Sequence, residues 1–363
     1  MTRPIGATLF AAAMIMAAPA CGQDRDPLAP LDTTEQAGSA ATSLQAPTDT
    51  SFSAYMAYVA QKARSQGVSQ RTIDAVIPGL TPNSRVIELD QSQPGGGPGT
   101  GIPDYAPYRR RHVTNDIVNR GKAKYREHYP VLARIQQQTG VDPFMILAIY
   151  GKETSYGRIT GNFDLPQSLA TLAWEGRRRD LFESEFIAAL KLMDKGYTRD
   201  HLKGSWAGAA GKPQFMPSNI LTLAADGDGD GFADIWNSEP DAFMSIANYL
   251  KQAGWQPGIH WGAAVRVPAS LDREAVKSTL VPPRCERVFA RHSRFLTVAE
   301  WKSLGVTFER GSLPDDVLAT LIEPDGRGET AYLTTQNYRP ILDYNCSNFY
   351  ALTNGLVADA IER

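Results

Sequence analysis

The chain is poor in the residues that usually hold catalytic metals. It has three cysteines and five histidines among 363 residues, and the histidines show no spacing typical of zinc ligands. Its formal net charge is only −2, so no strong attraction to polyanions such as nucleic acid is expected. The sequence indicates no metal or other cofactor for catalysis, and at 42% hydrophobic and 21% charged residues it has an ordinary globular composition.

The apolar run at the N-terminus, Ala7–Ala17, is too short to span a membrane. With Arg3 before it and small residues after it, this run predicts a secretion signal over residues 1–20. Two interpretations of its end stay open. One is cleavage after the small-residue pattern, and the other is lipidation of Cys21, which would become the mature N-terminus. Cys21 favours lipidation, although Ala18 stands where Leu is more usual.

The next segment, 21–50, has no aromatic residue and is rich in Ala, Thr, Pro, Asp and Gln. Because it cannot bury a core, we interpret it as a disordered tether. Apart from Cys21, only Cys285 and Cys346 remain. In an exported protein two such thiols favour pairing, although two unrelated buried thiols are the alternative.

The pattern of apolar residues predicts a mainly α protein. We expect an N-terminal helical region at 51–112, with helices at Ser53–Gln66 and Thr72–Ile77 and a Gly-rich loop at Pro94–Ile102. A mainly helical core is expected at 113–261. Short alternating runs between Pro and Gly predict a small mixed β insertion at 262–340. The residues 341–363 are expected to complete the core with a helix from about Ser347 to Ile361.

One helix of the core carries a candidate catalytic acid. Asp142 and Pro143 form a typical N-cap and first-turn pair, and Gly157 is expected to end the helix. Glu153 shares one face with apolar residues at spacings of three and four: Ile146, Ile149 and Tyr150. Burial raises the pKa of a carboxyl, as a general acid near neutral pH requires. From spacing alone, a solvent-facing Glu153 at the helix end is an equally good interpretation.

A segment of small residues follows about fifty positions later. The run Gly204–Gly211 lets backbone come close to a ligand. Ser205 and Gln214 offer hydrogen-bonding groups suited to a sugar hydroxyl or amide. Without further support, Ser205 is equally well interpreted as a helix N-cap and Gln214 as ordinary surface polarity.

Several ordered motifs resemble one known family. They are Glu-Thr-x-Tyr-Gly from Glu153, Gly-Ser-Trp-Ala-Gly-Ala from Gly204, Pro-Gln-Phe-Met-Pro-Ser from Pro213, and a closing Asp-Tyr-Asn-Cys-Ser-Asn-Phe-Tyr-Ala from Asp343. Together they resemble the membrane-bound lytic murein transglycosylase B family, from about Phe52 to the C-terminus. The resemblance implies a lysozyme-like helical core with a helical flank and a small β domain.

The resemblance also implies cleavage of the β-1,4 bond between N-acetylmuramic acid (MurNAc) and N-acetylglucosamine (GlcNAc) in peptidoglycan, with 1,6-anhydro ends. Glu153 would act first as acid and then as base, a substrate-assisted exception to the two-carboxylate scheme. No second acid stands beside Glu153 in sequence, and Asp164 is the nearest candidate that folding could bring in. A muramidase on the same fold and a non-catalytic peptidoglycan-binding protein are the alternatives.

The family's substrate contacts carry over onto matching positions. By resemblance Ser205 would hold the N-acetyl carbonyl or a nearby sugar oxygen, and Gln214 and Asn345 would bind the substrate near the acid. An aromatic wall around Glu153 and an arginine pair for peptide or muramoyl carboxylates are also implied. They are Tyr108, Tyr249 and Tyr344, and Arg177 and Arg178. From the residues alone, the tyrosines are as readily interpreted as core packing, and the arginine pair is more often a solvated helix start. Lys212 stands where the family usually has Gln, so it either alters a substrate contact or faces solvent.

An acidic loop resembles the front of an EF-hand. Its expected ligands are Asp226, Asp228, Asp230, the Phe232 carbonyl and Asp234. Loop position 12 is Asn237 instead of the usual bidentate Glu, which weakens or changes calcium binding. The resemblance implies a similar single loop in the family, and one loop instead of a pair leads us to expect a structural Ca²⁺ ion; an acidic turn without an ion is the alternative. The protein is expected to be a periplasmic monomer, anchored as an outer-membrane lipoprotein, whose partners are peptidoglycan glycan strands and the membrane.

Overall fold

The computed structural model describes residues 51–93, 103–282 and 284–363. The signal peptide, Cys21, the tether at 21–50 and the loop at Pro94–Ile102 lie outside the described residues, so these expectations stay predictions. Within the described ranges, no helix is both long and apolar enough to cross a membrane.

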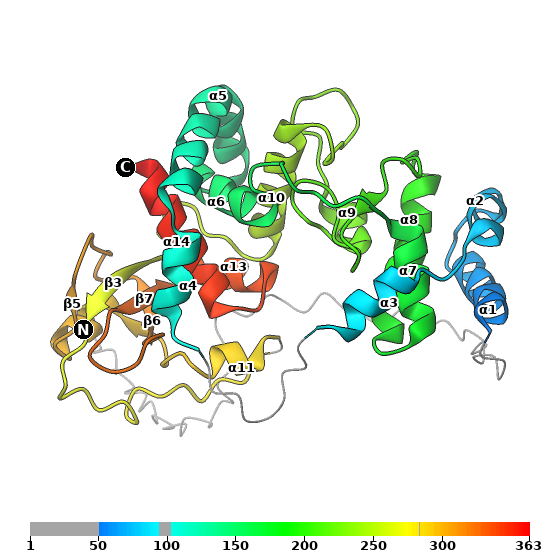
Figure 1. The fold of residues 1–363 in the computed structure, drawn as a ribbon. Coiled ribbons are helices and arrows are strands. Elements are labelled where there is room, and N and C mark those ends of the chain that lie inside the picture. Colours follow the sequence, from blue (N-terminus) through cyan, green and yellow to red (C-terminus); the bar gives the residue numbers. More distant parts are fainter. Residues whose placement is uncertain (1–50, 94–102, 283) are drawn as a thin grey trace, which may run out of the picture.

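The described chain is mainly helical (Figure 1), as the sequence predicts. Five helical segments precede the core: α1 (Phe52–Ser65), α2 (Gln70–Val76), η1 (Ile77–Gly79), α3 (Ser84–Gln91) and α4 (Tyr105–His112). The core helices are α5 (Asn115–Thr139), α6 (Pro143–Thr154), α7 (Leu165–Glu175), α8 (Arg179–Asp194), α9 (Pro217–Leu223), α10 (Glu239–Gln252), α13 (Tyr338–Tyr344) and α14 (Asn348–Glu362). The remaining helices and strands are α11 (Glu286–Phe289), α12 (Val298–Ser303), β1 (Phe163–Asp164), β2 (Lys203–Gly204), β3 (Gly262–Arg266), β4 (Leu296–Thr297), β5 (Thr307–Phe308), β6 (Leu318–Ile322) and β7 (Ala331–Thr335).

Side-chain caps fix where the two helices of the site begin. The Asp142 carboxylate accepts from the Phe144 N–H at 2.8 Å at the start of α6, and Pro143 takes the first helical position. The Ser347 hydroxyl accepts from the Tyr350 N–H at the start of α14. Both beginnings confirm the sequence prediction. The end of α6 does not, because the helix stops at Thr154, three residues before Gly157.

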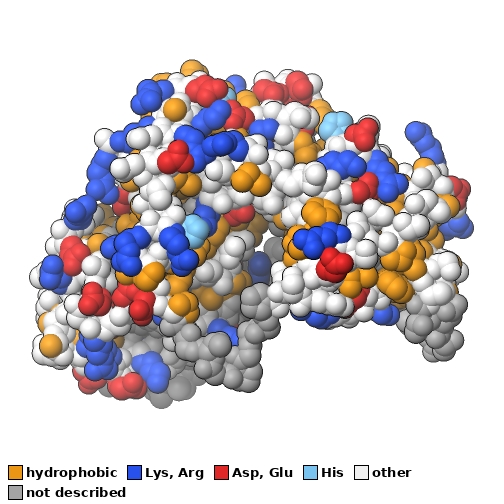
Figure 2. Space-filling model, in the orientation of Figure 1, with side chains coloured by type: hydrophobic (Ala, Val, Ile, Leu, Met, Phe, Trp, Pro, Cys, Tyr) orange, Lys and Arg blue, Asp and Glu red, His pale blue; other side chains and the backbone are white. Residues whose placement is uncertain are grey.

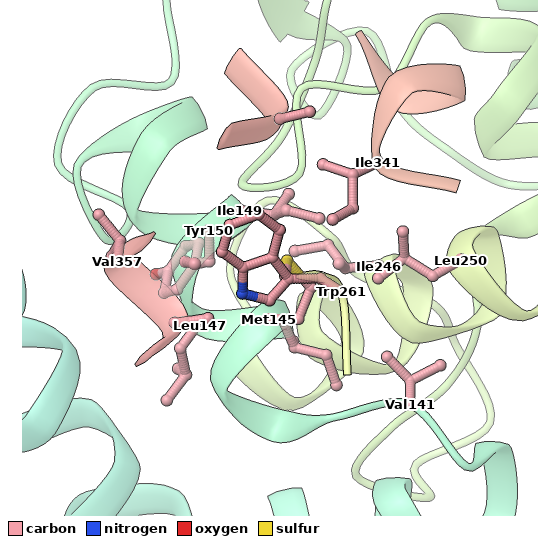
Figure 3. Close-up of a cluster of buried hydrophobic side chains, with 14 of the residues drawn as sticks. Val141, Met145, Leu147, Ile149, Tyr150, Ile246, Leu250, Trp261, Ile341 and Val357 are labelled. Carbon is pink, nitrogen blue, oxygen red and sulfur yellow. The ribbon is translucent and has the colours of Figure 1, made fainter. Parts of the chain in front are cut away.

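A first hydrophobic core surrounds α6, which is buried along most of its length (Figure 3). It packs between α5, α10 and α14. Helix α14 packs tightly against Trp261, because a Cβ on Gly355 would stand only 2.3 Å from the Trp261 ring. Glycine at this point lets α14 come close enough to bury the indole, whose Nε1 donates to Asp359 at 2.8 Å.

A second core joins the N-terminal helices to α7 and α8. Two carboxylates hold this flank together. Glu183 accepts from the Tyr55 hydroxyl at 2.6 Å and pairs with Lys62 of α1. Asp90 at the end of α3 is almost fully buried and pairs with Arg177 and Arg178 before α8. Figure 1 shows α1 and α2 at the end of the molecule opposite the sheet.

The insertion forms a five-stranded sheet in the order β4-β6-β7-β3-β5, and every pair is antiparallel. A third core lies beneath it around the fully buried Trp301 of α12. A disulfide between Cys285 and Cys346, with Cα atoms 5.4 Å apart, ties the insertion to the segment between α13 and α14. The structure thus pairs the two cysteines that the sequence left open.

Candidate active site

Glu153 lies near the C-terminal end of α6, partly buried against α14. The Tyr350 hydroxyl donates to its carboxylate at 2.5 Å. Burial raises the pKa of Glu153 from 4.5 to about 7, against the lowering effects of the Tyr350 hydrogen bond and the Lys152 charge. A carboxyl with this pKa can donate and take back a proton near neutral pH.

The turn after Glu153 has an unusual backbone. Ser155, Tyr156 and Gly157 all have positive φ, at 55°, 61° and 79°. A left-handed backbone is unfavourable for residues other than glycine, and they keep it only where surrounding contacts impose it. Here the Tyr156 hydroxyl donates to the Ile117 carbonyl at 2.9 Å, and Arg120 donates to the Ser155 carbonyl at 3.2 Å. The turn that follows the acid is therefore held firmly.

Thr154 joins this turn to the second motif. Its hydroxyl donates to the Lys212 carbonyl at 3.1 Å and accepts from the Gly157 N–H at 3.0 Å. The Lys212 side chain turns inward, which corrects the solvent-facing alternative drawn from sequence. Its ammonium donates to the Trp236 carbonyl, and burial lowers its pKa. The acid and the small-residue segment are thus brought together.

Ser205 lies at the start of that segment and Gln214 just after its end; Ser205 is not a helix N-cap, and Gln214 is half-buried. The Ser205 hydroxyl accepts from the Ala209 N–H at 3.0 Å. Gln214 has a φ of 54°, and its side-chain amide donates to the carbonyls of Thr160 and Gly211. These bonds fix the Gln214 amide, whose side-chain oxygen remains an acceptor.

Two of the three predicted tyrosines form one aromatic group. The rings of Tyr249 and Tyr344 lie 4.6 Å apart, and Phe215 packs on both. Burial raises the pKa of Tyr344, and the charge of Glu153 adds to the effect, so Tyr344 lies within electrostatic range of the acid. The surface in Figure 2 is hollowed beside α13, the helix that ends at Tyr344.

The third tyrosine, Tyr108, lies on a different side. Its ring packs on Phe349 at 5.4 Å, and the Lys152 ammonium lies 4.8 Å from its centre. Tyr108 therefore contacts Lys152, the residue that precedes Glu153 in α6. Asn345 ends α13 with an exposed side chain.

Arg177 and Arg178 contact Asp90 of the N-terminal flank. Their side chains are exposed for about two fifths of their surface, at 41% and 42%. The ion pairs hold them in place, and their contact with a substrate stays a prediction.

Tyr350 is the residue that sequence reasoning missed. It is buried, stands 197 positions after Glu153, and donates directly to the acid. The closing motif contained it, but only tertiary folding brings α14 onto α6. Asp164, the candidate second acid, instead caps α7 through the Gln167 N–H and pairs with Arg199 and Lys203. Among the described residues, Lys152 is the only charged group that shifts the pKa of Glu153.

The acidic loop places Asp226, Asp228 and Asp230 together, with one oxygen of each within 4.8 Å of the others. Carboxylate oxygens at this spacing fit a calcium ion. The side chains of Asp234 and Asn237 instead form hydrogen bonds within the loop. Asp234 accepts from the Trp236 and Asn237 N–H groups, and the Asn237 amide donates to Asp234 at 2.8 Å. Sequence reasoning also missed Asp241, which is buried and accepts from the N–H groups of Gly227, Asp228 and Asp234.

A buried acid with a raised pKa, a small-residue segment and a tyrosine wall on a helical core define a lysozyme-like, sugar-cleaving class of protein. The chain belongs to the family described as the transglycosylase SLT domain, whose model matches residues 51–359.

Similar proteins agree with this assignment. The membrane-bound lytic murein transglycosylase B of Escherichia coli is 31% identical over 257 residues, which are 70% of this chain and 66% of that protein. This chain thus spans just under two thirds of that relative. SltB3 of Pseudomonas aeruginosa, solved with NAG-anhNAM-pentapeptide, has 35% identity and a TM-score of 0.76, with 86% of this chain and 80% of that chain covered. The E. coli lytic transglycosylase Slt35, solved with calcium, has 27% identity and a TM-score of 0.66, with 85% and 92% covered.

Proposed function

We propose that this protein is a lytic transglycosylase that cleaves the MurNAc–GlcNAc β-1,4 bond of peptidoglycan and leaves 1,6-anhydromuramoyl ends. The observation that carries the proposal is Glu153, whose pKa of about 7 suits it to act as acid and then as base. The relative SltB3 was solved with NAG-anhNAM-pentapeptide, and that anhydro sugar is of the kind expected here.

In the proposed reaction the Glu153 carboxyl first protonates the glycosidic oxygen, which leaves with GlcNAc. The carbonyl oxygen of the muramoyl N-acetyl group attacks C1 from the other face and forms an oxazolinium-like ring. The Glu153 carboxylate then accepts the proton of the C6 hydroxyl. O6 attacks C1, the oxazolinium ring opens, and the 1,6-anhydro bond forms without consuming water. The acid ends the cycle protonated, as it began.

The residues around Glu153 take supporting roles in this proposal. Tyr350 stabilises the carboxylate between the two proton transfers, because its hydroxyl donates to the ionised form. Ser205 can donate its O–H to the N-acetyl carbonyl while it accepts from Ala209. Gln214 and Asn345 are proposed to bind the sugar. The aromatic walls of the site are proposed to be Tyr108, Tyr249 and Tyr344. The residues proposed to bind carboxylates of the substrate are Arg177 and Arg178.

We also propose that the acidic loop binds one structural Ca²⁺ ion. The oxygens of Asp226, Asp228 and Asp230 fit such an ion, and the similar Slt35 was solved with calcium. The Phe232 carbonyl and Asp234 would complete the set after Asp234 turns from Asn237. No step of the reaction depends on the ion.

For its location, we propose export, lipidation at Cys21 and outer-membrane anchoring of a monomer. A relative named as membrane-bound supports a place at the cell envelope. A tether of about thirty residues would let an anchored domain search the wall.

The test is a digest of purified peptidoglycan by the protein and by Glu153→Gln, with the products weighed by mass spectrometry. We expect anhydro-muropeptides, one water lighter than hydrolysis products, from the parent and none from the variant. Glu329→Gln, an exposed acid in the turn before β7, is the matched control and should digest like the parent.

Other results would select the alternatives. Reducing-end products would show a muramidase, in which water replaces the C6 hydroxyl. Binding without cleavage by both proteins would show a non-catalytic peptidoglycan-binding protein.

A further inference from the structure

A pocket of about 290 Å³ lies beside the first turn of α14. Pro103, Val288 and Phe349 supply apolar walls, and Arg287 and Arg291 supply two guanidinium groups. The rest of the lining comes from the closing motif, at Cys346, Ser347 and Asn348, which continue into Phe349. Arg287 and Arg291 belong to none of the motifs from which the activity was inferred.

Among the residues that the structure describes, the two arginines have no anionic partner. Neither Arg287 nor Arg291 forms an ion pair or a side-chain hydrogen bond with any described residue. Arg177 and Arg178 differ in this respect, because Asp90 engages both of them. Two unpaired guanidinium groups that face one pocket favour a ligand that carries carboxylates.

The pocket adjoins the site of Glu153 through two consecutive residues. Phe349 lines the pocket, and the next residue, Tyr350, donates to Glu153. The other side of Phe349 packs on Tyr108, over which the Lys152 ammonium lies. A group bound in this pocket is therefore separated from a sugar held at Glu153 only by the first turn of α14.

We propose that the Arg287–Arg291 pocket binds the carboxylate-bearing peptide that is attached to the muramoyl sugar. This inference rests on the proposed function. The glycan backbone is built mainly of uncharged hydroxyl and amide groups, whereas peptide branches bring carboxylates for the arginines and methyl groups for Val288 and Phe349. Bidentate bonds from guanidinium to carboxylate supply both affinity and orientation. SltB3 was solved with a pentapeptide-bearing NAG-NAM fragment, so a similar protein does accept such a branch.

The first test compares peptide-bearing glycan strands with strands from which the peptides have been removed, both digested by the full chain. We expect the double variant Arg287→Gln/Arg291→Gln to lose about tenfold in kcat/KM on peptide-bearing strands, since each arginine gives up a charge-assisted hydrogen bond. On peptide-free strands it should match the parent. The matched control is Arg294→Gln/Arg310→Gln, which removes two exposed arginines outside this pocket and should equal the parent on both substrates.

The second test measures binding of a fluorescent synthetic pentapeptide with free carboxylates, by anisotropy, and so does not depend on cleavage. We expect at least about fivefold weaker binding in the pocket variant and unchanged binding in the control. Equal binding by all three proteins, or an equal loss of cleavage on both kinds of strand, overturns the inference. A parent that binds the peptide through these arginines but makes no anhydro product overturns the proposed function and leaves the pocket standing.

Discussion

At the scale of single residues, the contact between Tyr350 and Glu153 sets the protonation of the acid. Burial raises the pKa of Glu153 to about 7, and the Tyr350 hydroxyl moderates that rise. Removing the donor should therefore raise the pKa further. The sign follows because the hydroxyl donates to the charged form, and loss of this bond favours the neutral carboxyl.

We expect Tyr350→Phe to move the basic limb of the pH profile of kcat/KM to higher pH. We also expect a loss of about tenfold in kcat, because the carboxylate formed during the reaction loses a charge-assisted hydrogen bond. Tyr344→Phe is the control, since its hydroxyl donates to the Pro213 carbonyl and not to the acid. Basic limbs that coincide in the parent and Tyr350→Phe would show that the contact does not tune Glu153.

The same burial should cost stability. The folded pKa of Glu153 is raised above its ordinary value of 4.5, so ionisation opposes folding as pH rises from about 4.5 to 7, and the full penalty stands above 7. Glu153→Gln cannot ionise, and we expect it to raise the free energy of unfolding by about 2 kcal/mol at pH 8 and by little at pH 4.5. Urea denaturation at both values, with Glu329→Gln as control, measures the difference. A gain of equal size at both pH values would contradict this cause.

Sequence identifies a site residue when the signal is local, and it misses one whose contact joins distant segments. Glu153 was found because its helix has an N-cap and an apolar face within twelve residues. Tyr350 was missed because its contact spans 197 positions. The left-handed backbone at Ser155 and Tyr156 gave no composition signal either, because contacts from Ile117 and Arg120 impose it.

At the scale of elements, the beginnings of α6 and α14 were predictable from caps, and the β insertion from its short alternating runs, whereas the order of the strands in the sheet was not. Capping is a local interaction, but the strand order β4-β6-β7-β3-β5 depends on pairings between distant segments. The link between the sheet and the catalytic core is similarly non-local. His292 lies between Thr320 of β6 at 2.9 Å and Asn348 of α14 at 2.8 Å. Burial lowers the pKa of His292 to about 4, so it stays neutral in this role.

The disulfide is the covalent part of that link, and it closes a loop with a sequence separation of 61 residues. We expect Cys285→Ser/Cys346→Ser to lower the free energy of unfolding by about 2–4 kcal/mol, as is typical for such a cross-link. Urea denaturation of parent and variant, each with and without reductant, tests this. Reductant should destabilise the parent to the level of the variant and leave the variant unchanged. A parent that is insensitive to reductant would contradict a stabilising disulfide.

At the scale of the whole molecule, the acidic loop is bonded to the site. The Lys212 N–H donates to the Ile235 carbonyl at 2.8 Å, and the Lys212 ammonium donates to the Trp236 carbonyl. The Lys212 carbonyl accepts from Thr154, which follows Glu153 directly. The loop is therefore connected to the end of α6 by hydrogen bonds that all involve Lys212.

Calcium should then stabilise the fold and support the site. An ion that binds only the folded chain adds about 2–3 kcal/mol to the free energy of unfolding at roughly one hundred times its Kd. We expect calcium to raise Tm relative to chelator. We expect only a small increase in the digestion rate, because Glu153 touches none of the residues that would bind the ion. Asp230→Asn should lose the shift in Tm, whereas Asp316→Asn, an exposed acid outside the loop, should keep it. Calorimetry with calcium, magnesium and chelator measures this. An equal response of both variants would show that the loop is an acidic turn held by its own hydrogen bonds, such as those that lower the pKa of Asp226.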